Sequence, residues 1–145
     1  MIYVPQSIEE TEKLRQWIEP RIPGVDIGSD SVCLAVIRSG AIAAVAAFYN
    51  YRKVDIELSF AADTPRWAST ETITFILSFP FIQLGTQRCT AMVRKSNKRC
   101  RKLLTGVGFK EEGRHAHAGP NLETIFSYGL TRQEFMKRYG QKIAA

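Results

Sequence analysis

Two long apolar runs separated by a short polar turn constrain the fold more than any other feature of the chain. Residues 32–37 (VCLAVI) and 41–48 (AIAAVAAF) flank Arg38-Ser39-Gly40, which is typical of a hairpin between two strands. Alanine favours helices, but the second run ends in aromatic residues and follows a glycine turn, which favours a strand. A sheet built around these runs needs helices on both of its faces.

The rest of the chain alternates between strand and helix patterns. Apolar and polar residues alternate with a period of two over residues 54–61, the mark of a half-exposed strand. We predict further strands at 1–4, 88–93, 109–118 and 124–130, and helices at 7–19, 69–84 with a kink at Pro80, 97–105, and from Thr131 onward. This order predicts a mixed α/β (α+β) fold with a mostly antiparallel sheet, in a single domain spanning residues 1–145.

The charge of the chain predicts an anionic partner. Twenty Lys and Arg residues against fourteen Asp and Glu residues leave a formal net charge of +6, and much of the excess lies between residues 88 and 114. A phosphate-bearing partner is expected, either a nucleic acid or a phosphorylated small molecule. A merely solvated basic surface is an equally open interpretation.

The cysteines and the N-terminal sequence predict a cytoplasmic protein. Cys33, Cys89 and Cys100 are odd in number and widely spaced, so neither a disulfide framework nor a zinc site is indicated. The first residues lack the basic and apolar regions of a signal peptide. The apolar stretches are also too short to span a membrane.

A spaced pattern in the second half of the chain resembles a known family. The pattern consists of Asn97, Leu103-Leu104, Gly108-Phe109 and Glu112-Gly113, and it follows a predicted strand and helix. With the order of elements, it resembles the GNAT superfamily of acyl-CoA-dependent N-acetyltransferases, and most of all the ribosomal-protein-alanine type and small bacterial and phage members. The resemblance spans most of the chain and is strongest over residues 57–113.

This resemblance implies acetyl-CoA as cosubstrate and a set of residues that bind it. The central strand at 54–61 would splay from its neighbour, so that Phe60 and Ala61 lie beside the pantetheine chain, while Asn97 and Arg101 would approach the cofactor from the basic helix. The phosphates would lie against the loop and helix start formed by Arg66, Trp67, Ala68, Ser69 and Thr70. The chain departs from the family here, because TPRWASTE contains no glycine. A core position for Trp67 is an alternative interpretation.

The resemblance also suggests where the catalytic groups lie. Glu57, with Asp55 on the same strand face, occupies the position of a carboxylate base, although a surface carboxylate is the open alternative. Leu104 occupies the position at which many relatives have a tyrosine that acts as general acid. Cys100 occupies the position at which the ribosomal-protein type has a serine. We therefore predict Glu57 and Cys100 as catalytic residues, with Tyr128 as a second candidate for the acid. A buried structural cysteine and a core or edge aromatic are the open alternatives for Cys100 and Tyr128.

Two histidines close in sequence do not predict a metal site. His115 and His117 would share one face of the strand predicted at 109–118, but no third ligand accompanies them. A solvated hairpin tip is the favoured interpretation.

The predicted function is direct transfer of an acetyl group from acetyl-CoA to a primary amine of a protein or a small molecule. The alternative is an inactive GNAT-like module that binds nucleic acid or a protein partner. Nucleic acid is the less favoured partner, no membrane partner is expected, and the exposed edges of the last strands make a homodimer reasonable.

Overall fold

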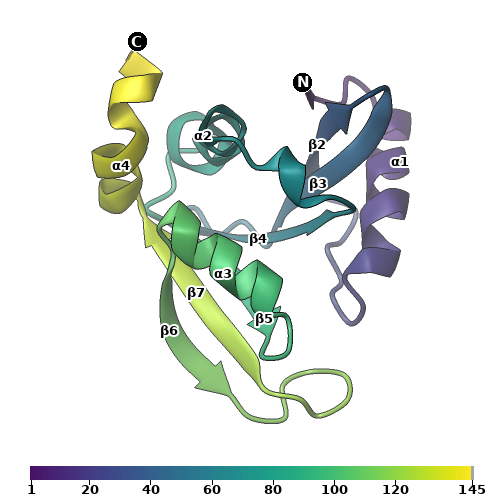
Figure 1. Ribbon diagram of the computed structural model, residues 1–145, viewed down its shortest axis with the longest axis vertical. Coiled ribbons are helices and arrows are strands. Elements are labelled where there is room, and N and C mark those ends of the chain that lie inside the picture. Colours follow the sequence, from purple (N-terminus) through teal and green to yellow (C-terminus); the bar gives the residue numbers. More distant parts are fainter. Residues whose placement is uncertain (145) are drawn as a thin grey trace. The chain divides into compact units, whose positions relative to one another are not determined.

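The computed structural model describes residues 1–144, which divide into two compact units (Figure 1). The first unit contains residues 1–50 and 58–77, and the second contains residues 51–57 and 78–144. Strand β4 (Asp55–Ala62) begins in the second unit and ends in the first.

Each unit combines strands with helices, which confirms the mixed α/β class. The other strands are β1 (Ile2–Tyr3), β2 (Val32–Arg38), β3 (Ala41–Tyr49), β5 (Arg88–Arg94), β6 (Lys110–His115) and β7 (Ile125–Thr131). The helices are α1 (Ile8–Ile18), α2 (Thr70–Ser78), α3 (Lys98–Val107) and α4 (Arg132–Ala144). Within residues 1–144, no helix combines the length and apolar character that crossing a bilayer requires.

The first unit is built on the predicted hairpin. Strand β2 pairs antiparallel with β3, and β1 pairs antiparallel with β2. The turn is made by Ser39 and Gly40, both with positive φ (54° and 77°), the backbone that matches the twist of two paired strands. The alanine-rich run is therefore a strand, as the glycine turn and the aromatic end predicted.

Strand β3 is buried on both faces because a helix lies on either side of the hairpin. In Figure 1, α1 lies on one side of β2 and β3, and α2 lies on the other. Leu14 and Ile18 of α1 pack with Cys33 and Val45, which point to the α1 side. The small alanine side chains between them leave room for closely packed helices.

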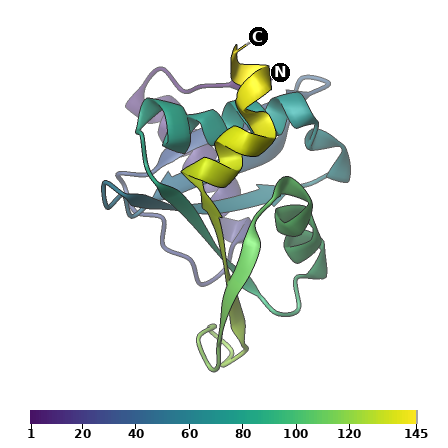
Figure 2. The ribbon, with the colours of Figure 1, turned by 90° about the vertical axis from the view of Figure 1, so that its left-hand side faces the viewer.

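The second unit has one covered sheet face and one open face. Strand β7 pairs antiparallel with β5 on one side and with β6 on the other. The β5 residues Cys89, Ala91 and Val93 are buried, whereas Arg88 and Met92 alternate with them toward the other face. Figure 2 shows α3 beside the β6–β7 hairpin, on the covered face. The open face therefore carries the polar residues of this unit.

The helix predicted at 69–84 departs from α-helical geometry at the predicted kink. Helix α2 ends at Ser78, and a π-helical turn follows at Phe79–Gln83. Pro80 lies inside this turn; it lacks an N–H and its ring clashes with the preceding helical turn, so the α-helical ladder cannot continue. Gly85, with φ of 69°, then turns the chain toward β5.

The basic helix α3 ends two residues later than predicted, and α4 satisfies its end. The chain leaves the helix at Gly108, whose φ of 121° favours glycine. The guanidinium of Arg138 donates to the carbonyl oxygen of Gly106 (2.6 Å), and the hydroxyl of Tyr139 donates to that of Val107 (2.5 Å). Two carbonyl groups that a helix end leaves unpaired are therefore bonded by α4.

Helix α4 begins with the predicted capping box. Thr131 Oγ1 accepts a hydrogen bond from the N–H of Glu134 (3.1 Å), and Glu134 Oε1 accepts one from the N–H of Thr131 (3.0 Å). Glu134 Oε2 also pairs with Lys110 Nζ of β6 (2.7 Å). First the Lys110 contact, and then the bonds from Thr131, lower the pKa of Glu134 to about 2.

Removing the Glu134 carboxylate should lower the free energy of unfolding at neutral pH. It should also make that free energy depend less on pH in the acidic range. The lowered pKa means that the charged form stabilises the fold above pH about 4.5 and that this contribution is lost as pH falls toward about 2. We expect Glu134→Gln to lose about 1 kcal/mol at pH 7, the usual value of a helix cap. Urea unfolding from pH 7 to pH 2 measures this. The exposed carboxylate variant Asp30→Asn is the control, and an equal effect of both variants would contradict the assignment.

Candidate active site

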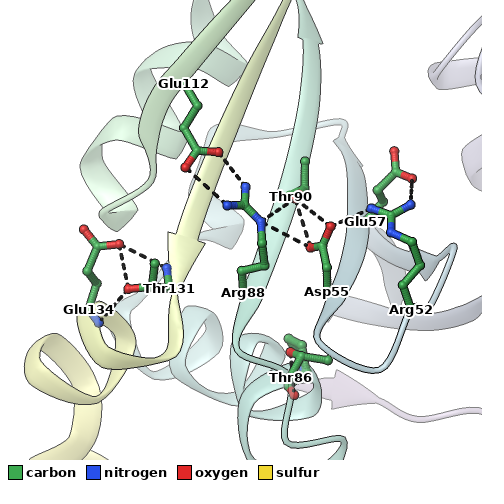
Figure 3. Close-up of polar contacts among 10 residues, drawn as sticks. Arg52, Asp55, Glu57, Thr86, Arg88, Thr90, Glu112, Thr131 and Glu134 are labelled. Carbon is green, nitrogen blue, oxygen red and sulfur yellow. Dashed lines mark hydrogen bonds and ion pairs between the residues drawn. The ribbon is translucent and has the colours of Figure 1, made fainter.

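The start of β4 carries a nearly buried carboxylate held by three neighbours (Figure 3). Asp55, 8% exposed, accepts a hydrogen bond from the hydroxyl of Thr90 on β5 (2.9 Å). Its other oxygen pairs with Arg52 Nη2 at 2.5 Å, and Arg88 Nε lies 3.6 Å from the first. A buried carboxylate is costly unless it is paired and hydrogen-bonded, so these contacts account for its position.

The network continues from Arg88 across β7 to β6. Arg88 Nη2 pairs with Glu112 Oε1 at 2.5 Å. Glu112 lies at a bulge, because the register of β6 against β7 shifts between Glu111 and Gly113. The ion pair passes directly over Gly129, where a Cβ atom would overlap both charged groups. Glycine at this position therefore allows the strands on either side of β7 to be joined by an ion pair.

Glu57 lies on the same face of β4, two residues after Asp55, and is more exposed. Its Oε2 atom is 3.5 Å from Arg52 Nη1, and its side chain is 19% exposed, against 11% for Asp55. Arg52 therefore lies between the two carboxylates, as Figure 3 shows. Of the two, Glu57 has the longer contact with the shared arginine and the more exposed side chain, so it is the carboxylate that a substrate reaches more easily.

The loop predicted to bind phosphate lies in the first unit. Its backbone is held by hydrogen bonds to side-chain hydroxyl groups, and it contains no glycine. Thr64 Oγ1 accepts a hydrogen bond from the N–H of Arg66 (3.3 Å), and Pro65–Trp67 form a short 3-10 turn. Trp67 is buried, with its ring centroid 5.7 Å from that of Phe60. This burial agrees with the alternative that Trp67 is a core residue. Arg66, by contrast, is exposed.

Ser69 caps the start of α2 in the same loop. Its Oγ atom accepts a hydrogen bond from the N–H of Thr72 (3.1 Å) and donates one to Thr72 Oγ1 (2.8 Å). Ser69 and Thr70 are exposed, whereas Ala61 and Ala68 are half-buried. The residues predicted to face phosphate thus form one loop and helix start in the first unit, and helix N-termini favour anions.

Asn97 and Cys100 are brought together at the start of α3 in the second unit. Asn97 Oδ1 accepts a hydrogen bond from the N–H of Cys100 (3.1 Å), so the asparagine is the helix cap. Burial raises the pKa of the Cys100 thiol to about 12. Because an ordinary thiol has a pKa of about 8.5, proton donation from Cys100 to a product thiolate would be uphill.

Arg101 is committed to structural contacts within the second unit. Its Nε atom donates to the hydroxyl of Tyr128 (3.3 Å), its Nη1 atom donates to the carbonyl oxygen of Lys95 (2.9 Å), and its guanidinium lies 4.3 Å from the centre of the Phe126 ring. Arg114 approaches the same ring at 4.5 Å. Arg101 therefore joins the helix to the covered face of the sheet, where Tyr128 is also buried.

The histidines do not share a strand as predicted. Strand β6 ends at His115, whose Nε2 atom lies 3.1 Å from Ser127 Oγ, and His117 lies in the following turn with φ of 59°. Both are exposed. Among residues 1–144, no cluster of three or more His, Cys, Asp or Glu side chains is arranged to hold a metal ion.

Sequence reasoning missed the partners of Asp55. The alternation of Arg88 and Thr90 on β5 was a usable signal, because residues two apart share one face of a strand. Nothing local in the sequence marks Arg52, which precedes β4 in a loop, or Glu112, which reaches Arg88 only through the bulge.

Solved structures with the same fold are acetyltransferases. A mutant form of spermidine N-acetyltransferase from Vibrio cholerae matches with a TM-score of 0.73 at 11% identity, covering 95% of this chain and 98% of that one. A GNAT-family acetyltransferase from Bacillus anthracis matches with a TM-score of 0.62 at 15% identity, covering 75% and 70%. The ribosomal-protein-S5-alanine acetyltransferase from Vibrio fischeri matches with a TM-score of 0.61 at 14% identity, covering 72% and 63%.

These likenesses establish the class of fold. No protein-family model and no curated protein sequence matches the chain. At identities of 11–15%, the shared property is the architecture. The chain has the GNAT acetyltransferase fold, as the pattern around the basic helix predicted.

Replacing Gly129 should break the ion pair above it. We expect Gly129→Ala to lose about 1 kcal/mol, because the Arg88 and Glu112 side chains must move apart to admit the methyl group. The double variant with Glu112→Gln should lose little more than Gly129→Ala alone, because both changes remove one interaction. Urea unfolding of the three variants measures this coupling.

Gly106→Ala is the matched control for this substitution. A Cβ at this position in α3 meets no atom within 4 Å. Alanine should therefore stabilise the helix by about 0.5–1 kcal/mol. Fully additive effects of Gly129→Ala and Glu112→Gln would contradict the proposed coupling.

Proposed function

We propose that the protein is an acetyl-CoA-dependent N-acetyltransferase that acts on a primary amine. The observation that carries the proposal is the presence, on a fold shared with acetyltransferases, of a partly exposed carboxylate at Glu57 on β4, the position that the resemblance gives to a base. The acceptor is a small amine or an amine of a protein. The names of the Vibrio cholerae and Vibrio fischeri structures make spermidine and an alanine of a protein the first acceptors to test.

The residues that would bind acetyl-CoA fall into a phosphate part and a pantetheine part. Arg66 and the start of α2 at Ser69 and Thr70 suit the pyrophosphate, because an exposed guanidinium and helical N–H groups favour anions. Phe60, Ala61 and Asn97 are proposed for the pantetheine chain. Arg101 is proposed to act indirectly, by fixing α3 to Tyr128.

Glu57 is proposed as the general base of a direct transfer. It takes a proton from the protonated amine, whose nitrogen then attacks the thioester carbonyl carbon. The new C–N bond forms as the C–S bond breaks, and the departing thiolate takes up the second proton, which the former amine nitrogen loses as it becomes an amide. Backbone N–H groups of β4 would stabilise the oxygen that becomes negative. The raised pKa of the Cys100 thiol makes it a poor proton donor, and this scheme needs no proton from it.

A second candidate function is nucleic-acid binding through α3. Lys98, Arg99 and Lys102 are exposed, and the first turn of α3 contains no acidic residue. Within the described chain, no ion pair involves these three side chains. A surface of this kind attracts a phosphate backbone with an affinity that falls steeply with salt.

Thermal unfolding with cofactors distinguishes these functions. Acetyl-CoA or CoA at a hundred times its dissociation constant should raise the free energy of unfolding by about 2.7 kcal/mol, which corresponds to roughly 5–10 °C. ATP is the control for unspecific phosphate binding. An equal shift with ATP, or no shift at millimolar CoA, would favour the nucleic-acid candidate, which salt-dependent binding of an oligonucleotide then tests.

Glu57→Gln should abolish most of the transfer and leave cofactor binding intact. We expect kcat to fall by about 10²–10⁴ because a general base is lost, with an unchanged thermal shift on acetyl-CoA. Glu111→Gln is the control, since Glu111 also pairs with an arginine, at 3.2 Å, but lies on β6. Thiol release with spermidine and with an alanine-initiated peptide measures turnover, and full activity of Glu57→Gln would refute the assignment.

A further inference from the structure

Arg21 joins the end of α1 to the end of β4 within the first unit. The residue lies in the short 3-10 turn that follows α1. Its Nε and Nη2 atoms donate to the two carboxylate oxygens of Asp63, each at 2.9 Å. Asp63 comes directly after β4. A bidentate contact of this kind fixes the orientation of both groups, because two N–H bonds of the planar guanidinium match the two oxygens.

The same guanidinium is also bound to α1. Its Nη1 atom donates to the carbonyl oxygen of Trp17 (2.6 Å), and its central carbon lies 3.6 Å from the centre of the Trp17 ring. Trp17 packs against the core cluster of the first unit that includes Leu14 and Ile18. Exposed ion pairs usually contribute little, partly because both side chains must be immobilised. Arg21 is already held by Trp17, so its contact with Asp63 is a firm link between α1 and β4.

Asp63 stands at the start of the loop that is proposed to bind the pyrophosphate. Its own N–H donates to the carbonyl oxygen of Ala43 on β3 (2.9 Å). The next residue, Thr64, accepts a hydrogen bond from the N–H of Arg66 (3.3 Å). Because the loop contains no glycine, its backbone is confined to ordinary conformations. The direction in which its N–H groups point therefore depends on how its first residues are held.

Two arginines of this region have different surroundings. The three guanidinium nitrogens of Arg21 all donate to protein oxygens. Arg66 is exposed, and within residues 1–144 no ion pair involves its guanidinium. Arg66 is therefore available to an anion, whereas Arg21 is committed to contacts inside the protein.

We propose that Arg21 is a positioning residue for the phosphate part of the cofactor site. This inference rests on the proposed function, in which the loop from Arg66 to Thr70 binds the pyrophosphate of acetyl-CoA. Arg21 itself does not contact the phosphates. Through Asp63 it fixes the start of the loop to α1, so that the N–H groups of the loop face the anion before the cofactor arrives. A side chain contact thus supports a loop that has no glycine.

Hydrogen exchange of the protein without ligand tests whether the contact holds the loop. In Arg21→Gln and in Asp63→Asn, we expect the amide hydrogen of Arg66 to lose about 2–5-fold in protection, the factor that corresponds to an exposed ion pair. Nuclear magnetic resonance measures this exchange. Arg15→Gln is the control, because Arg15 forms ion pairs only within the α1 segment, with Glu12 (2.9 Å) and Glu19 (3.0 Å). Unchanged protection in both test variants would overturn the proposal.

Calorimetric binding to the double variant Arg21→Gln/Asp63→Asn tests the consequence for the cofactor. This variant keeps the net charge of the chain, so a lower affinity is not caused by the loss of a positive charge near the phosphates. The probes are CoA and 3′-phosphoadenosine 5′-diphosphate, which carries the phosphates but lacks the pantetheine chain. We expect both dissociation constants to rise by the same factor of about 2–5.

The double variant Arg15→Gln/Glu19→Gln is the matched control for the binding experiment. It removes an ion pair of 3.0 Å from the same part of the first unit without a change in net charge, and it should leave both dissociation constants unchanged. If Arg21→Gln/Asp63→Asn binds both probes as the unmodified protein does, or loses affinity for CoA alone, Arg21 does not position the phosphate loop.

The experiments separate this inference from the proposed function. If the unmodified protein binds both probes and the double variant binds them more weakly, but no amine is acetylated, the proposed transfer fails and the positioning role stands. If acetyl transfer occurs and the double variant binds as the unmodified protein does, the positioning role fails and the proposed function stands. If the unmodified protein binds neither probe, both are overturned. Thermal unfolding of each variant verifies that the fold is intact.

Discussion

The buried carboxylate of Asp55 sets the arrangement of the open sheet face in the second unit. A charge in this position requires partners, and the structure supplies Arg52, Thr90 and Arg88. Arg88 in turn needs an acidic partner, which the bulge of β6 provides as Glu112. Each of these contacts therefore depends on the one before it, and the series begins at Asp55 of β4.

The same arrangement separates the roles of two carboxylates only two residues apart. Asp55 is surrounded by firm contacts and serves the structure. Glu57 shares an arginine with it across a longer distance and is more exposed. Proton transfer needs a group that the substrate can reach, so the difference in exposure, rather than in residue type, makes Glu57 the better candidate for chemistry.

The basic helix is held at both ends and along its inner face, so its exposed side chains are not needed for its position. Asn97 caps its first turn, and Arg138 and Tyr139 of α4 bond carbonyl groups at its last. Arg101 fixes its middle to the covered sheet face through Tyr128 and Phe126. The opposite, cationic side is thus not needed to hold the helix in place, and it is free to attract phosphate groups.

The sequence by itself determined the local elements and much of the class of fold. The turn at Ser39-Gly40, the caps at Ser7, Asn97 and Thr131, and the alternation along β4 act through neighbours in the chain, so their outcomes follow from short-range rules. The tertiary structure alone decided that Arg101 would serve packing and that Arg52 would lie between two carboxylates. These depend on contacts between residues far apart in sequence, or on the balance of several contacts at once, and no local pattern encodes them.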